Sequence, residues 1–69
     1  MSSVKHAIGE HDVVELLDYV GEWAAGTSGT VVRDHGDSKL IEISDDRGMM
    51  LDLFEVAEDR LKLVTKHSS

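Results

Sequence analysis

From Gly26 onward, short apolar runs alternate with polar turns that contain glycine or aspartate. Runs rich in valine, isoleucine and leucine, bounded by such turn residues, are typical of β-strands joined by tight turns. Residues 57–60 interrupt the pattern with alanine and charged residues, which could form a single helical turn. The expected strands are Thr30–Arg33, Lys39–Ser44, Met49–Val56 and Leu61–Val64. The pattern therefore predicts a mainly β protein.

The alternation within these strands predicts which side chains are buried. In Lys39–Ser44, Ile41 and Ile43 share one face, because successive side chains of a strand point to opposite sides. In Met49–Val56 the alternation breaks at Leu53-Phe54, where two large apolar residues adjoin, and this predicts a bend or bulge. The predicted core consists of Val14, Leu16, Val31, Ile41, Ile43, Leu51, Leu53 and Leu61.

Glycine marks the turns, since the chain contains no proline. Gly29 closes a glycine-bracketed segment that starts at Gly26, and Gly48 follows two aspartates and an arginine. Both glycines are expected at positive φ, a region that is sterically costly for residues with a Cβ atom.

The segment Asp12–Ala25 fits two structures. Its apolar residues recur at helical spacing, with Asp12 suited to cap a helix and Gly26 suited to end it. Against a helix, Gly21 lies inside the segment and Val13-Val14 is a β-branched start. If Asp12–Leu17 is instead a strand, the chain has five strands and its count and spacing match a small five-stranded SH3-like barrel.

Several motifs resemble those of an uncharacterised family of small bacterial and archaeal proteins that have an SH3-like barrel. The matching segments are Asp12–Leu16, Gly26–Val32, Leu51–Phe54 and Ala57–Leu61, and the resemblance covers His11–Val64. It implies that Asp12–Leu17 is a strand and that residues 18–28 form the first long loop. The chain departs from the family at Gly21–Thr27, which is more apolar and could hold a short helix. The resemblance implies no activity, because this fold carries many functions.

The length of 69 residues is enough for one small domain, with an ordered core expected over about residues 8–65. Both ends, Met1–Lys5 and Lys66–Ser69, are small and polar and are expected to be loose. The core of so short a chain is small, so a partner or self-association could add stability.

Charge and composition limit the function classes. The chain has 14 acidic and 7 basic side chains and a net charge of −7. This surface disfavours nucleic acid and favours a basic partner. There is no cysteine, and no apolar run approaches the length of a signal peptide core or a membrane helix, so a cytoplasmic location without membrane contact is expected.

Residues with catalytic potential form no recognisable pattern. The histidines, His6, His11, His35 and His67, lack the i, i+4 spacing of a helical metal site. Gly26–Thr30 is neither a nucleophile elbow nor a phosphate-binding loop. The sequence therefore predicts no enzyme activity, no cofactor and no metal site.

The first long loop carries the candidate partner-binding residues. Tyr19 and Trp23 are two of only three aromatic residues, and aromatic side chains are frequent anchors at interfaces. Alternatively, Trp23 folds back and caps the small core. Asp18 and Glu22 lie beside them and would attract a basic partner. The favoured function is a small acidic non-catalytic protein-interaction module. The alternatives are an immunity or antitoxin-like inhibitor of a basic toxin and an RNA- or ribosome-associated barrel.

Overall fold

The computed structural model describes residues 7–67, which form five strands and one 3₁₀ turn. In chain order the elements are β1 (Val13–Leu16), β2 (Ser28–Asp34), β3 (Ser38–Ser44), β4 (Met50–Ala57), η1 (Glu58–Arg60) and β5 (Leu61–Thr65). The strands form one antiparallel sheet in the order β4-β3-β2-β1-β5. The predicted mainly β class is confirmed, and so is the helical turn before the last strand.

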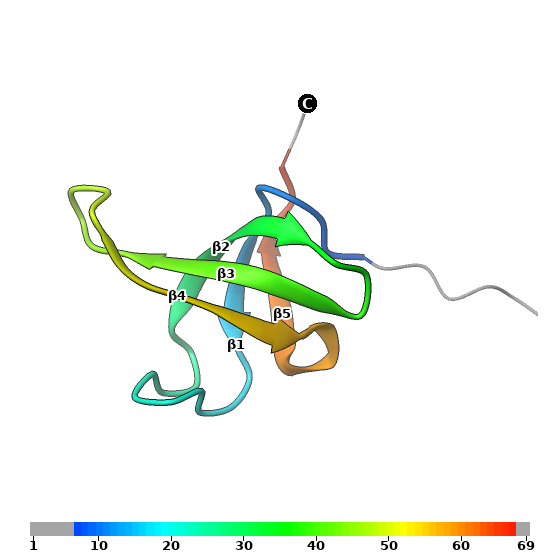
Figure 1. The fold of residues 1–69 in the computed structure, drawn as a ribbon, viewed down its shortest axis with the longest axis horizontal. Coiled ribbons are helices and arrows are strands. Elements are labelled where there is room, and N and C mark those ends of the chain that lie inside the picture. The colour runs from blue at the N-terminus through cyan, green and yellow to red at the C-terminus, as the bar shows by residue number, and fades with distance from the viewer. Residues whose placement is uncertain (1–6, 68–69) are drawn as a thin grey trace, which may run out of the picture.

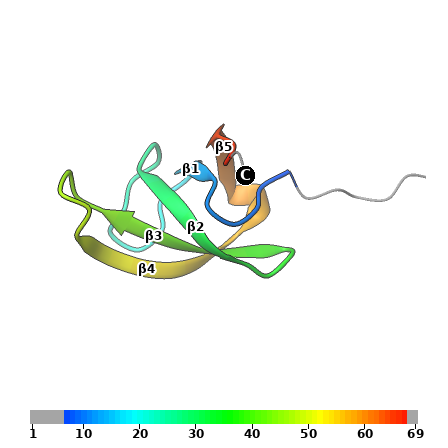
Figure 2. The same ribbon diagram turned by 90° about the horizontal axis from the view of Figure 1, so that it is seen from above.

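The sheet bends over so that β1 and β5 run across the direction of β3 and β4 (Figure 1). Seen from above, β3 and β4 form one side of the molecule and β1 and β5 lie toward the other (Figure 2). Among residues 7–67, the two edge strands β4 and β5 do not pair with each other. The sheet is therefore open, and the predicted closed barrel is not confirmed.

The core lies between the two halves of the bent sheet. Six of its members were predicted from the alternation pattern: Val14, Leu16, Val31, Ile41, Ile43 and Leu61. Ile8 and Val56 complete the buried apolar cluster, and Phe54 packs against it. The inward positions of β1, β2 and β3 thus follow directly from the period of two in their sequences.

Leu51 and Leu53 were predicted in the core, and this prediction is wrong: they are 55% and 44% exposed. The pairing of β4 with β3 places Phe54 opposite the buried Ile41, and directly opposed residues point to the same face. The inward positions of β4 are therefore the even-numbered ones. The register shifts at Leu51, not at Leu53-Phe54, because Ile43 pairs with residue 52 while Ser44 pairs with residue 50.

The segment Asp12–Ala25 is a strand followed by a loop, so the helical alternative is wrong. β1 ends at Leu16, and the loop 17–27 contains an isolated antiparallel bridge between Val20 and Trp23. Gly21 allows this tight turn because it adopts a φ of +57°. The loop therefore holds a small hairpin in place of the short helix that was considered for it.

Only one of the two glycine assignments is correct. Gly48 has a φ of +82° in the turn between β3 and β4, as predicted. Gly29 lies within β2, is buried, and does not have a positive φ. A Cβ atom at Gly29 would lie 2.5 Å from Cγ2 of Ile41, so this position requires glycine because β3 packs directly against it.

Asp12 joins the two ends of the described chain. Its buried carboxylate accepts hydrogen bonds from the backbone N–H of Gly9 at 2.8 Å, from Nζ of Lys66 at 2.9 Å and from the backbone N–H of His67 at 2.7 Å. Lys66 and His67 are therefore held in place, contrary to the loose end expected for them. The remaining predicted tail residues, 1–5 and 68–69, lie outside the described residues.

The hydrogen bonds to the Asp12 carboxylate should make the stability of the protein depend on pH. Burial alone raises the pKa of Asp12, but the hydrogen bonds from His67, Gly9 and Lys66 outweigh it and lower the pKa from 3.8 to about 2. A carboxyl whose pKa is lowered on folding stabilises the protein above its unfolded pKa, and this contribution is lost as the pH falls toward the folded pKa. We expect Asp12 to contribute about 2 kcal/mol at neutral pH, lost between about pH 5 and pH 2.

Urea unfolding of the wild type and of Asp12→Asn at several pH values measures this contribution. The variant should be less stable at pH 7 and should lose less stability between pH 5 and pH 2, because it carries no carboxyl at this site. Equal losses for the two proteins would contradict the assignment of this acid dependence to Asp12.

Candidate functional site

The first loop, residues 17–27, bonds to two other parts of the chain, η1 and β4. At its start, the backbone N–H of Leu17 donates to the carbonyl of Arg60, next to β5, at 2.9 Å. Farther along, Nε1 of Trp23 donates to Oδ2 of Asp52 on β4 at 2.8 Å. The loop therefore contacts the edge strand β4 and the η1 turn that leads into the other edge strand, β5, and within residues 7–67 these two strands do not pair directly.

Three of the four predicted binding residues lie on the surface of this loop. Tyr19 is 66% exposed, and Asp18 and Glu22 are exposed as well. Asp18 also orders the loop, because its Oδ1 accepts the backbone N–H of Tyr19 at 2.7 Å. Leu17, which the sequence reasoning did not select, is exposed beside them. Tyr19 and its neighbours stay a predicted contact surface.

Trp23 is placed differently from the other three residues. Its side chain is half-buried and packs against the apolar core. The indole N–H is used in the bond to Asp52, so the ring fixes the loop to β4. This position favours a structural role for Trp23, while Tyr19 is better exposed for contact with a partner.

His35 in the β2–β3 turn, Ser38 at the start of β3 and Glu55 on β4 form a polar cluster at the surface. Oε2 of Glu55 bonds to Nδ1 of His35 at 2.5 Å and accepts from the hydroxyl of Ser38 at 2.6 Å. The contacts with His35 and Ser38 lower the pKa of Glu55. Nucleophilic catalysis requires serine bonded to histidine, whereas both groups here bond to one carboxylate oxygen. The arrangement holds the β2–β3 turn against β4.

Among residues 7–67, the other two histidines are His11 and His67, which lie beside each other. The rings of His11 and His67 meet edge to face with centroids 5.1 Å apart, beside the Asp12 cluster. Within residues 7–67, no three histidine, aspartate or glutamate side chains converge as metal ligands would. His6 lies outside the described residues.

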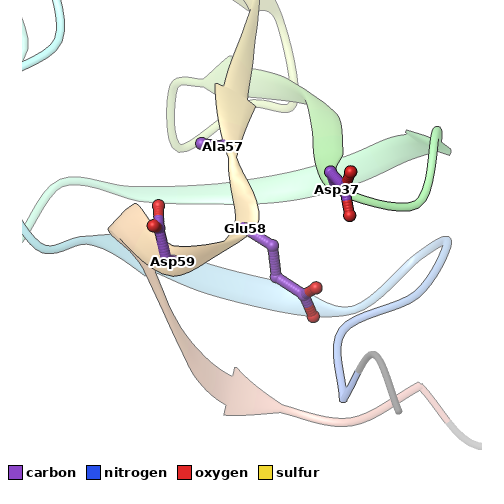
Figure 3. A pocket seen from close by; sticks show the side chains of 4 residues that line it. All are labelled: Asp37, Ala57, Glu58 and Asp59. Atoms are coloured by element: carbon purple, nitrogen blue, oxygen red, sulfur yellow. The ribbon is translucent and has the colours of Figure 1, made fainter. Parts of the chain in front are cut away.

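An open hollow of about 300 Å³ lies between the β2–β3 turn and η1, lined by Asp37, Ala57, Glu58 and Asp59. The three carboxylates point in different directions (Figure 3). Glu58 points toward the N-terminal segment, where it accepts the backbone N–H of Ile8 at 3.2 Å. The hollow is therefore a negatively charged depression in the surface and does not gather its carboxylates around a single point.

A second apolar surface lies at the start of β4 and was not predicted. It consists of Met49, Met50, Leu51 and Leu53, all of which are exposed. The adjacent residues Leu53 and Phe54 were the sequence signal for such a surface: only one of two neighbouring strand residues can face the core, so the other must be an exposed apolar residue. Which of the two faces outward is decided by pairing with β3, and the sequence pattern does not contain that information.

Comparisons of the chain with protein-family models, with curated proteins and with solved structures found no match. No helix in the described part of the chain is long and apolar enough to cross a membrane.

Proposed function

We propose that this protein is a small, acidic, non-catalytic module that binds another protein through its first loop. The observation that carries the proposal is the exposure of Leu17 and Tyr19 beside the acidic residues Asp18 and Glu22. A large aromatic side chain that is exposed on a fixed loop can bury a large area on binding at a small entropy cost. The flanking carboxylates would speed association with a basic partner.

The strand order and the 3₁₀ turn before the last strand support a finer description of the fold as an SH3-like barrel. In this description the first loop, with its Trp23–Asp52 bond, takes the place of direct pairing between the two edge strands. The lack of cysteine supports a cytoplasmic location.

The charge of −7 supports a sharper alternative, an immunity or antitoxin-like protein that covers the basic active site of a toxin. The same charge counts against an RNA- or ribosome-associated role, because phosphate contacts need lysine and arginine. A toxin gene adjacent to the gene for this protein would favour the inhibitor function over a general interaction module.

Substitution of Tyr19 tests the contact surface. A protein captured from the lysate of the producing cells is purified, and its affinities for the wild type, Tyr19→Ser and Trp23→Ala are measured. We expect Tyr19→Ser to weaken binding about tenfold or more, as loss of an interface anchor does. Asp18→Asn with Glu22→Gln should slow association and make it less sensitive to salt.

Melting curves distinguish binding from folding. Tyr19→Ser should melt like the wild type, whereas Trp23→Ala should lower the melting temperature because Trp23 packs on the core. Val64→Thr is the matched control, since Val64 is an exposed apolar residue on β5, away from the loop. If Tyr19→Ser binds as tightly as Val64→Thr, the first loop is not the contact surface.

A further inference from the structure

The outer edge of β4 is open. Among the described residues, β4 pairs with β3 on one side, and no strand pairs with it on the other. An open strand edge presents a row of backbone N–H and C=O groups that can pair with another extended chain. Charged side chains, proline and bulges oppose such pairing; residues 50–57 contain no proline or lysine, their two charges are the acids Asp52 and Glu55, and the register shift lies near the start of the strand.

The bonds between β3 and β4 show which backbone groups face the open side. The N–H of Glu58 donates to the carbonyl of Asp37 at 2.8 Å, one position beyond the Ser38–Ala57 pair. Because bonded and non-bonded pairs alternate in an antiparallel ladder, the even-numbered residues of β4 bond to β3. The backbone groups of Leu53, Glu55 and Ala57 therefore point to the open edge. In agreement, the N–H of Leu53 bonds to the side chain of Asp52 at 2.8 Å and not to β3.

The side chains along this edge divide into two kinds. Its first half carries the exposed apolar group Met49, Met50, Leu51 and Leu53. Its second half carries Glu55 and leads to Asp59 at the acid-lined hollow beside η1. Glu42, which is paired with Leu53 across the sheet, adds another carboxylate beside the edge.

We propose that the open edge of β4 binds an extended segment of a partner protein, which adds to the sheet as a further strand. The segment carries lysine or arginine toward Glu55 and Asp59, and apolar side chains toward Met50, Leu51 and Leu53. Backbone hydrogen bonds supply affinity, and alternate side chains supply specificity, as in other cases of strand addition. The inference rests on the proposed role as a protein-interaction module, but it does not depend on the first loop.

Charge complementarity selects this occupant over a second copy of the chain. Two copies would bring together surfaces that each carry a net charge of −7, and each edge would add its own Glu55, Asp52 and Glu42. A basic segment instead meets opposite charge at Glu55 and Asp59 in the second half of the edge. The bound segment should therefore dissociate more readily at high salt, whereas pairing of two copies would be favoured by salt.

Ala57→Pro removes an edge donor with little effect on the fold. Ala57 has φ −62° and ψ 139°, close to the φ that proline requires, and its N–H points away from β3. Proline is tolerated at such edge positions because no bond of the ladder is lost. Ala57→Ser is the matched control, since it changes the side chain and keeps the N–H group.

The test uses the full chain and a short capped peptide of alternating lysine and valine, with an N-methylated version of the peptide as control. We expect the unmodified peptide to bind, and Ala57→Pro to weaken it about three- to tenfold, the range for one lost hydrogen bond. Ala57→Ser and Tyr19→Ser should bind it like the wild type. The N-methylated peptide has the same charge but fewer donors, and should bind more weakly.

Amide hydrogen exchange of the wild type gives a second readout that does not depend on the folding of a variant. The peptide should slow exchange at Glu55 and Ala57 and leave Tyr19 unchanged. Equal binding of both peptides, or protection at Tyr19 without protection at Glu55 and Ala57, overturns the strand-addition proposal and leaves the first-loop proposal standing. Sedimentation that shows a dimer of the wild type and a monomer of Ala57→Pro also overturns it, because the occupant is then a second copy.

Discussion

Gly29→Val is expected to destabilise the protein by about 3 kcal/mol, at the upper end of the cost of overpacking a core. The added side chain would begin 2.5 Å from Cγ2 of Ile41, 3.0 Å from Cδ1 of Ile43 and 3.1 Å from the carbonyl oxygen of Glu42. Both isoleucines are buried and β-branched, so neither can move aside without disturbing the core. A small domain has a total stability of only several kcal/mol, so this variant should be close to unfolding at 37 °C.

Gly48→Val is the control for this prediction. Gly48 has a φ of +82° but no atom within 4 Å of an added Cβ, so valine would meet backbone strain without overpacking. The cost should be about 1–2 kcal/mol, and the melting temperature should fall less than for Gly29→Val. Thermal unfolding followed by far-UV circular dichroism gives both values. If Gly48→Val proves the more damaging change, β3 does not pack against Gly29 as described.

Lys39→Met is expected to cost about 3 kcal/mol, the upper end of the range for hydrogen bonds made by a charged group, because only Lys39 of this ion pair is buried while Asp34 is 35% exposed. Lys39 is fully buried, and its Nζ donates to Oδ1 of Asp34 at 2.6 Å and to the carbonyl of Gly36 at 2.7 Å. The same Nζ lies 4.0 Å from Oε1 of Glu58 in η1. One ammonium group thus joins the β2–β3 turn to η1, and methionine has a similar length but supplies no charge or donor.

The double variant Lys39→Met with Asp34→Asn separates charge from packing. Asparagine removes the negative charge but keeps an oxygen for the N–H of Gly36, which now bonds to Asp34 at 2.8 Å. The second substitution should therefore recover part of the stability that the first one loses. Urea unfolding of both single variants and the double variant measures the coupling. Additive losses would mean that Lys39 stabilises the fold through its bond to the carbonyl of Gly36 and not through its pairing with the Asp34 charge.

The interior position of Lys39 was not predictable from the sequence. In Lys39–Ser44 the alternation places residue 39 on the same face as Ile41 and Ile43, yet a charged side chain at the end of a strand usually points to solvent. Burial became favourable because Asp34, Gly36 and Glu58 meet at this point from three separate elements. Asp12 is a similar case, since two of its hydrogen-bond donors follow it by more than fifty residues.

The candidate site was predictable in part. Tyr19, Asp18 and Glu22 were selected as surface residues of a long loop and they are exposed there, because a polar, glycine-containing segment between strands has little apolar surface to bury. Trp23 belongs to the same loop, but its side chain bonds to Asp52 and packs on the core. These contacts form only when the sheet bends and brings β4 and the core next to the loop, so the local sequence does not predict them.

Local patterns in the sequence determined strands β2 to β5, the turn at Gly48 and the inward faces of β2 and β3, because alternation and turn chemistry act between neighbouring residues. These patterns left Asp12–Ala25 open between a helix and a strand, and the pairing of β1 with β2 and β5 decides for the strand. The tertiary structure decided the face of β4, where Leu51 and Leu53 point outward because Phe54 lies opposite Ile41. It also decided that Gly29 is needed because β3 packs directly against it, and that the side chains of Asp12 and Lys39 are buried. These features depend on strand register and on contacts between distant segments, and a one-residue change in register reverses every side chain of a strand.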